Sequence, residues 1–142
     1  MTLTELQKKI KVPKNRMNSF GHYNYRSQED ILIAIKPLLS KEDELIIGDE
    51  VVLVGDRIYV KATIKLKLGD KEYTNSAFAR ESNIKKGMDD SQITGTASSY
   101  ARKYALNGLL LIDDVKDADT DEYKKQSNEP NLIAQKFNKE TL

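Results

Sequence analysis

Residues 57–68, "RIYVKATIKLKL", decide the fold class. Apolar side chains occupy every even position from Ile58 to Leu68, and arginine, tyrosine, lysine or threonine occupies every odd one. Because successive side chains of a strand point to opposite faces, this alternation predicts a half-buried strand with one basic face. The turn signals Gly-Asp precede it at 55–56 and follow it at 69–70. The sequence therefore predicts an antiparallel meander of three strands, at about 47–54, 57–68 and 71–80.

A long helix is expected after the meander. Asp89 and Gln92 have the spacing of a capping box, so the helix should begin at about residue 90. At 100° per residue, one stripe of this helix is expected to pack against the sheet. That stripe consists of Ile93, Ala97, Tyr100, Ala101, Tyr104, Gly108 and Leu111. Its two tyrosines are accordingly interpreted as structural.

The opposite side of the same helix is unusually small. Gly95, Ser98 and Ser99 surround Arg102 there. Small residues allow another chain to approach closely, and an arginine can then hold a phosphate with two hydrogen bonds, with Lys103 as a second cation. Alternatively, Arg102 pairs with Asp113, Asp114 or another carboxylate and the small side packs against a neighbouring subunit. Periodicity alone leaves both interpretations open.

Shorter helices are expected before the meander. Apolar residues at helical spacing predict a first helix that ends before Pro13. Ser27 and Asp30 form an acidic variant of the capping box and open a second helix, in which Pro37 predicts a kink or an early end. Residues 14–26 read as an ordered loop. The predicted fold class is α+β: a β-β-β-α core with N-terminal helices, spanning 1–115, followed by an acidic and largely mobile tail, 116–142.

Composition argues against several classes of protein. There is no cysteine and a single histidine, His22, which disfavours thiol catalysis, zinc sites and a Ser-His triad. No phosphate-binding GxxxxGK[ST] motif occurs, and the carboxylates of "DADTD" at 117–121 match a calcium loop poorly. No signal peptide or membrane-length apolar run is found. We therefore expect a cytoplasmic protein that is not an enzyme, with no metal, no cofactor and no membrane partner.

Charge is distributed unevenly along the chain. Residues 1–112 hold 18 Lys and Arg against 14 Asp and Glu, whereas residues 113–142 hold 5 against 8. This asymmetry suggests a body that faces a polyanion and an acidic appendage, although ordinary surface charge would give the same count. The basic side of the strand at 57–68 is open to the same two interpretations.

Two longer stretches resemble a known family. They are "NSFGHYNYRSQEDILIAIKPLL" at 18–39 and "KKGMDDSQITGTASSYARKYALNGLLLI" at 85–112, followed by aspartates. Their motifs resemble those of the ERF (essential recombination function) family of phage single-strand annealing proteins, over about residues 5–119. Lys103 stands where a second arginine is commoner, and the acidic run is interrupted. The resemblance implies ATP-independent binding and annealing of single-stranded DNA during phage homologous recombination.

The resemblance also implies partners and sites. It implies a homo-oligomer, as a ring or filament, that acts on single-stranded DNA in the bacterial host cell, with phage or host recombination proteins as further partners. The expected DNA-binding residues are cations, with two tyrosines as candidates for stacking on bases: Lys14, Arg16, Tyr23, Tyr25, Arg26, Lys85, Lys86, Arg102 and Lys103. A protein that coats single strands without annealing them is the alternative. A third hypothesis, a nuclease or other metal enzyme, is supported only by the carboxylates of the tail.

Overall fold

The computed structural model describes residues 1–83 and 87–112. These residues divide into two compact units, which we describe separately. The core unit consists of 1–12 and the described part of 27–112, and the hairpin unit consists of 13–26. The predicted boundary at residue 115 and the predicted tail lie outside the described residues.

The core unit is built on one antiparallel sheet. Its strands are β3 (Glu44–Val54), β4 (Arg57–Leu68) and β5 (Lys71–Arg80), in the order β3-β4-β5. The even residues of β4 from Val60 to Leu68 are buried, as the alternation predicted. Together with the helix that follows, this sheet confirms the predicted α+β class, and β3 begins three residues earlier than predicted.

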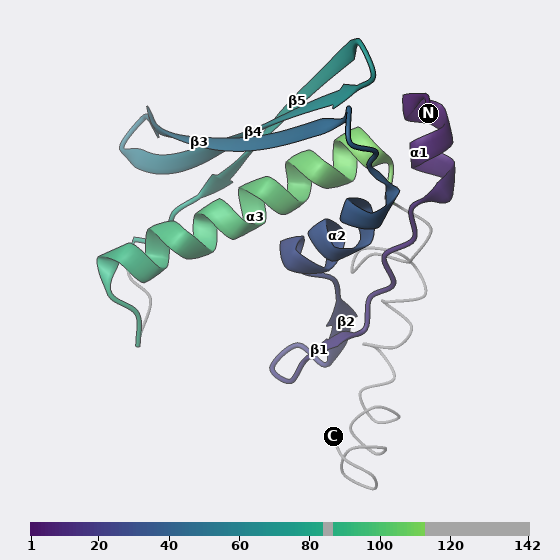
Figure 1. Cartoon of the computed structure of the whole chain (residues 1–142). Helices are drawn as coiled ribbons and strands as arrows, with labels where there is room; N and C mark the ends of the chain where they lie inside the picture. The colour runs from purple at the N-terminus through teal and green to yellow at the C-terminus, as the bar shows by residue number, and fades with distance from the viewer. Residues whose placement is uncertain (84–86, 113–142) are drawn as a thin grey trace, which may run out of the picture. The chain divides into compact units, whose positions relative to one another are not determined.

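Helix α3 (Asp90–Leu110) lies along one face of this sheet (Figure 1). The predicted capping box is present, since the Asp89 carboxylate accepts a hydrogen bond from the Gln92 N–H at 2.8 Å. The Gln92 side chain in turn accepts one from the Asp89 N–H at 2.9 Å. These bonds satisfy two N–H groups that the start of a helix leaves without partners.

The N-terminal helices pack against the sheet and the C-terminal part of α3. Helix α1 (Leu3–Lys9) is capped by Thr2, and α2 (Gln28–Ile35) begins with the predicted Ser27–Asp30 capping box. A short 3-10 helix, η1 (Lys36–Leu38), takes over where Pro37 was expected to end α2. The main hydrophobic cluster joins all these helices to the sheet through Leu6, Ile10, Ile31, Ile35, Ile64, Leu66, Leu106 and Leu110.

The hairpin unit corrects the prediction of a loop at 14–26. Two short strands, β1 (Arg16–Asn18) and β2 (Tyr23–Tyr25), pair antiparallel. Asn18 makes the turn, because its side-chain oxygen accepts hydrogen bonds from the N–H groups of Phe20 at 2.8 Å and Gly21 at 3.0 Å. Such side-chain turns are typical of asparagine. Strands of three residues are too short for an alternating pattern to reveal.

The predicted packing stripe of α3 is partly wrong. Ile93, Ala97 and Ala101 are buried as expected, but Tyr100 is 45% exposed, Tyr104 48% and Leu111 58%. Ala105, Leu106, Leu109 and Leu110 are buried instead. The cause is the short distance between the helix and the sheet. Alanines meet the sheet opposite Val60 and Ala62, and the larger tyrosines are displaced to the margin of the contact.

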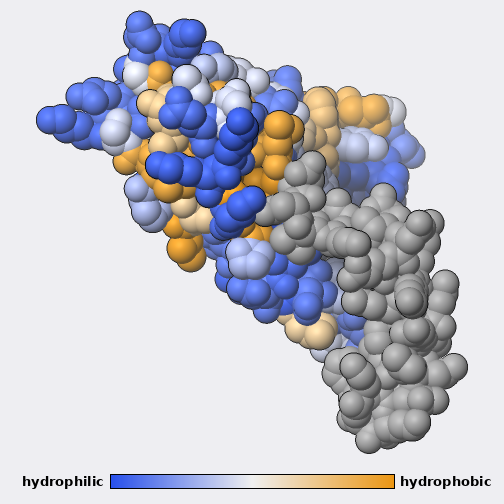
Figure 2. Space-filling model, turned by 90° about the vertical axis from the view of Figure 1, so that its right-hand side faces the viewer, coloured by the Kyte–Doolittle hydropathy of each residue, from blue (hydrophilic) through white to orange (hydrophobic). Residues whose placement is uncertain are grey.

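The face of the molecule drawn in Figure 2 is mostly hydrophilic, with apolar residues gathered into patches between the charged ones. Within residues 1–83 and 87–112, no helix is both long and apolar enough to cross a membrane.

Gly108 lies close to a side chain of β5. A Cβ added there would lie 2.8 Å from the side-chain nitrogen of Asn75, which donates a hydrogen bond to the Ala105 carbonyl at 2.8 Å. A Cβ added to Gly95, on the same helix, would meet nothing within 4 Å. The two glycines therefore offer a matched comparison.

We predict that Gly95→Ala stabilises the protein by about 0.5–1 kcal/mol, because alanine loses less backbone entropy than glycine in a helix. Gly108→Ala should instead lower stability, because the new methyl group displaces the Asn75 amide from its hydrogen bond. Chemical denaturation of both variants measures this difference. In an Asn75→Ala background Gly108→Ala should become stabilising, and equal effects at the two glycines would contradict the close approach.

Candidate nucleic-acid interface

A cation and two aromatic rings meet on the exposed margin of α3. The Lys103 ammonium lies 4.8 Å from the centre of the Tyr100 ring and 5.9 Å from that of Tyr104. The two rings are one helical turn apart, with centroids 6.0 Å from each other and planes tilted by 41°. Both tyrosines are about half exposed. We call Tyr100, Lys103 and Tyr104 the tyrosine–lysine cluster.

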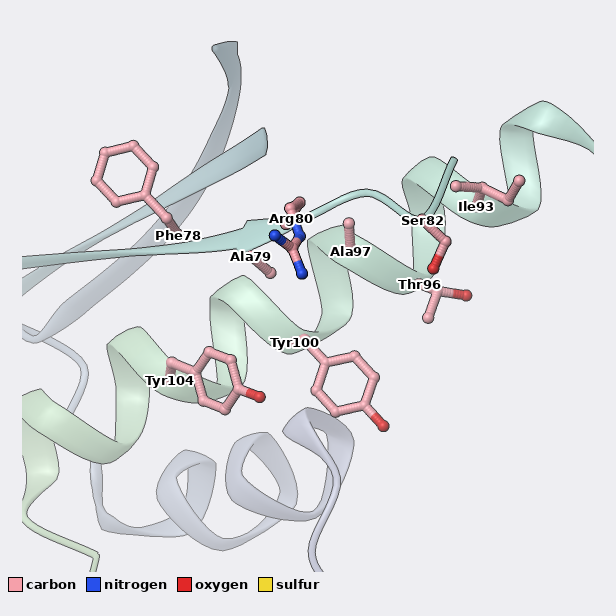
Figure 3. A pocket seen from close by; sticks show the side chains of 9 residues that line it. All are labelled: Phe78, Ala79, Arg80, Ser82, Ile93, Thr96, Ala97, Tyr100 and Tyr104. Atoms are coloured by element: carbon pink, nitrogen blue, oxygen red, sulfur yellow. The ribbon is translucent and has the colours of Figure 1, made fainter. Parts of the chain in front are cut away.

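A groove that is lined in part by the two tyrosines of this cluster runs along β5. It has a volume of about 370 Å³ and is lined by Phe78, Ala79, Arg80, Ser82, Ile93, Thr96, Ala97, Tyr100 and Tyr104. Ala79 points toward α3, whereas Phe78 projects from the other side of the strand (Figure 3). Because residues from both faces of β5 line it, the groove follows the edge of the strand. We call it the β5-edge groove.

The basic face of the sheet is less positive than the sequence of β4 suggests. Lys61 is paired across the strands with Glu50, and Lys67 lies between Glu44 and Glu72. Lys61 also lies over the ring of Phe78, 5.7 Å from its centre. Carboxylates on both neighbouring strands reduce the attraction of this face for phosphate, so it is a weaker candidate than α3.

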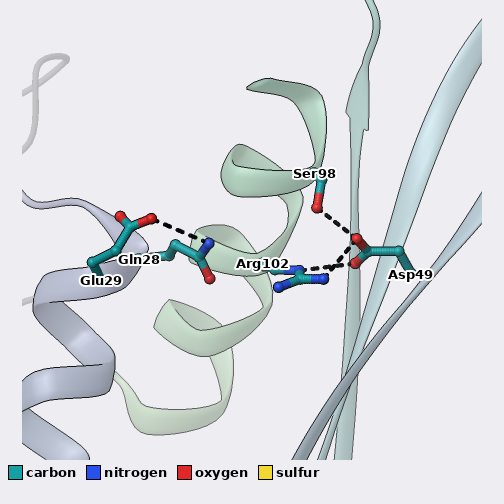
Figure 4. A network of polar contacts seen from close by, with 5 residues as sticks. All are labelled: Gln28, Glu29, Asp49, Ser98 and Arg102. Carbon is teal, nitrogen blue, oxygen red and sulfur yellow. Dashed lines mark hydrogen bonds and ion pairs between the residues drawn. The ribbon is translucent and has the colours of Figure 1, made fainter. Parts of the chain in front are cut away.

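Arg102 is held by an aspartate of β3. Its Nε donates to one Asp49 oxygen at 3.1 Å and its terminal nitrogen to the other at 2.9 Å (Figure 4). The Ser98 hydroxyl donates to the same carboxylate at 2.5 Å. Of the two interpretations of the small side of α3, this geometry favours the pairing with a carboxylate. The partner is Asp49, and Asp113 and Asp114 lie outside the described residues.

The surroundings of Asp49 shift its acidity. Partial burial by itself raises the pKa of this carboxyl, but the hydrogen bonds from Arg102 and Ser98 and the nearby guanidinium charge outweigh it, and the pKa is lowered. The side chains of Arg102 and Asp49 are 31% and 26% exposed. The pair therefore joins α3 to β3 while staying in contact with solvent.

The other predicted DNA-binding residues fall into two groups. Lys14, Arg16, Tyr23, Tyr25 and Arg26 all belong to the hairpin unit, where Arg16 pairs across the strands with Tyr25. The rings of Tyr23 and Tyr25 meet edge to face at 6.3 Å, and Arg26 is only 3% exposed. Lys85 and Lys86 lie outside the described residues. Each unit thus offers a candidate surface of its own.

Sequence reasoning missed the aromatic part of the α3 surface. Tyr100 and Tyr104 were assigned to the core, and Phe78 and Arg80 were not considered. The spacing Tyr-x-x-Lys-Tyr contained a signal, since residues three and four apart on a helix are neighbours. Among the described residues, no group of three or more histidine, cysteine, aspartate or glutamate side chains is placed to hold a metal ion. The "DADTD" run lies outside them.

Comparison with known proteins places these features in a family. A model of the ERF superfamily matches residues 1–141. The chain belongs to the ERF superfamily. It is 59% identical over 126 residues to the essential recombination function protein of Salmonella phage P22, which covers 89% of this chain and 61% of that relative. The chain thus spans about three fifths of the relative's length. No solved structure matches significantly.

We predict that Asp49→Asn destabilises the protein by about 1 kcal/mol at neutral pH. An uncharged amide cannot form the ion pair that the partly exposed Asp49 carboxylate makes with Arg102. The folded-state pKa of Asp49 is lowered, so the stability it contributes is complete above the unfolded pKa of about 3.9. That contribution disappears as the pH falls through the lower folded value. Melting curves between pH 7 and pH 2.5 should therefore show the two proteins converging below about pH 4.

The matched control is Glu42→Gln, which changes an exposed carboxyl in a turn. Its difference from the wild type should stay small over the same range. A gap between wild type and Asp49→Asn that persisted at the lowest pH would show that Asp49 does not act through its charge.

Proposed function

We propose that the protein binds single-stranded DNA and anneals complementary strands without ATP, as part of phage homologous recombination. Membership in the ERF superfamily and the recombination function named for the phage P22 relative support the recombination role. The observation that carries the proposal is the tyrosine–lysine cluster of α3, in which two exposed rings and an ammonium lie within 6 Å of one another.

This combination suits an unpaired strand. Every base has a flat face that can stack on an aromatic ring, so stacking tolerates any sequence, and a cation beside the ring can neutralise the adjoining phosphate. A duplex hides its base faces, so it would gain only the phosphate contact. The hairpin unit offers a second surface of the same chemistry, with Tyr23, Tyr25 and Arg16.

Annealing needs more than binding. A strand held by its phosphates and by one face of its bases keeps the pairing edges of those bases accessible to a complementary strand. No nucleotide hydrolysis enters this scheme, because pairing itself is favourable once the strands are aligned. The protein then acts without catalysis, by holding strands in an extended form. We further propose that it does so as a homo-oligomer, because a single short chain covers few nucleotides.

We expect the protein to bind a single-stranded oligonucleotide more tightly than the corresponding duplex, and to accelerate pairing of complementary strands with ATP and magnesium absent. Affinity should fall steeply with salt because binding releases counterions from the phosphates. Fluorescence anisotropy and a strand-annealing assay measure these properties. Binding without accelerated annealing would support the coating alternative, and metal-dependent strand cleavage would support a nuclease.

Lys103 and Arg102 should behave differently, although they are neighbours in the sequence. Lys103→Ala should weaken binding and reduce the slope of log affinity against log salt by about one unit, with the melting temperature nearly unchanged. Arg102→Ala should lower the melting temperature, because it leaves Asp49 without its partner, and should leave the slope of the folded protein unchanged.

Lys41→Ala, which removes an exposed cation in a turn, is the control for net charge. The opposite pattern, a reduced slope for Arg102→Ala and none for Lys103→Ala, would return Arg102 to the DNA site. It would also remove the tyrosine–lysine cluster from that site.

A further inference from the structure

The turn between β1 and β2 presents a phenyl ring to solvent (Figure 1). Phe20 lies in this turn and is 95% exposed, more than any other large apolar residue among those that the structure describes. A single exposed apolar side chain is common on protein surfaces and needs no explanation by itself. What distinguishes Phe20 is the number of contacts that fix the turn that carries it.

The backbone of this turn is fixed by Asn18. The Asn18 side-chain oxygen accepts hydrogen bonds from the N–H groups of Phe20 and Gly21, at 2.8 and 3.0 Å. Its side-chain nitrogen donates to the Tyr23 hydroxyl at 3.0 Å. One side chain thus joins the residue that carries the ring to the opposite strand of the hairpin. His22 completes the turn with a φ of 53°, in the left-handed region.

Tyr23 supports the same turn with its ring. A Cβ added at Gly21 would overlap the ring of Tyr23, so this ring lies directly against the backbone of the turn. The rings of Tyr23 and Tyr25 meet edge to face, with centroids 6.3 Å apart. The hydroxyl of Tyr23 is bonded to Asn18. Tyr23 is therefore already engaged through its ring and its hydroxyl, and it holds in place the turn that carries Phe20.

The hairpin unit carries positive charge and no carboxylate side chain. Residues 13–26 contain Lys14, Arg16 and Arg26, and neither aspartate nor glutamate. Arg26 is buried, whereas Arg16 is exposed. An exposed aromatic ring on a cationic hairpin suits a ligand that is both aromatic and anionic, and a nucleic-acid strand has both properties. An apolar pocket of a protein partner would require the ring but not the cations.

We propose that Phe20 inserts between two neighbouring bases of a single strand, and that Asn18 and Tyr23 position it for this role. A side chain that is 95% exposed has both faces of its ring open, so each face can stack on one base. The two rings of the tyrosine–lysine cluster are only about half exposed and lie beneath an ammonium. This inference rests on the proposed function, to which it adds the residue that enters the stack of bases.

The fixed turn reduces the cost of this insertion. Unstacking two bases costs free energy, and a mobile loop would add the cost of becoming ordered on binding. The hydrogen bonds to Asn18 and the contact with Tyr23 order the turn before DNA arrives. Apolar side chains that separate neighbouring bases act in this way at other nucleic-acid interfaces. The inserted ring also spaces the bases apart, so the strand is held extended.

The first test uses a fluorescent reporter. The chain contains no tryptophan, so Phe20→Trp provides a single indole at the turn. A single-stranded oligonucleotide should quench its emission, because an indole stacked on bases loses fluorescence. A strand of equal length with abasic sites in place of its bases keeps the phosphates and should quench little. Met17→Trp is the matched control, since Met17 is 52% exposed on the same hairpin, and its emission should change little with either strand.

The second test measures affinity. Phe20→Ala should weaken binding of a single strand about tenfold, with the melting temperature and the slope of log affinity against log salt unchanged, because no charge is removed. Phe20→Leu keeps an apolar side chain without a flat ring and should weaken binding nearly as much. Asn18→Ala should weaken binding by the wild type but add nothing in a Phe20→Ala background, because Asn18 acts through Phe20.

Equal affinities of wild type and Phe20→Ala, equal quenching by the abasic strand, or additive effects of Asn18→Ala and Phe20→Ala would overturn the proposal. A Phe20→Leu variant that binds like the wild type would also overturn it, because an apolar contact would then suffice. A wild type that binds no single strand overturns the proposed function and this inference with it. A wild type that binds and anneals strands, with Phe20→Ala unaffected, overturns this inference alone.

Discussion

The close packing of α3 against the sheet is the constraint on which the rest of the structure depends. Ala97 and Ala101 meet Val60 and Ala62, and Gly108 lies against Asn75. Side chains this small bring the helix near enough for Asn75 to reach the Ala105 carbonyl and for Asp49 to reach Arg102. They also leave no room for a large ring at the contact. The position of both tyrosines at the surface is therefore a consequence of how the core is packed.

The same packing explains why the helix covers only part of the sheet. A single helix crosses about two strands of a three-stranded sheet, and here it crosses β4 and β5. The third strand keeps its apolar residues exposed beyond Asp49. The Asp49–Arg102 pair marks the limit of the covered region, with packed side chains on one side of it and the exposed Val51 and Leu53 on the other. The partial cover of the sheet by one helix thus accounts for both the β5-edge groove and these exposed residues.

Local signals in the sequence were sufficient for most of the fold. The alternation of β4, the Gly-Asp turns and the two capping boxes involve neighbouring residues, and each predicted its element correctly. The errors concern properties that depend on distant residues. The orientation of α3 about its axis is set by the alanines that meet β4, and the partner of Arg102 lies 53 positions away. The hairpin at 16–25 was missed because its turn depends on one asparagine side chain. Hydrophobic periodicity carries no information about contacts between distant residues or about a turn made by a single side chain.

The position of Lys103 has a further consequence for selectivity. In the free protein its ammonium covers the ring faces of Tyr100 and Tyr104, which are the surfaces that a base would use. Under the proposed function, a base that stacks on these faces displaces the ammonium, and a phosphate next to that base is the natural place for it to go. The lysine would then be exchanged for the base. A neutral aromatic compound offers no phosphate in return, so the proposed exchange would discriminate in favour of a nucleotide chain.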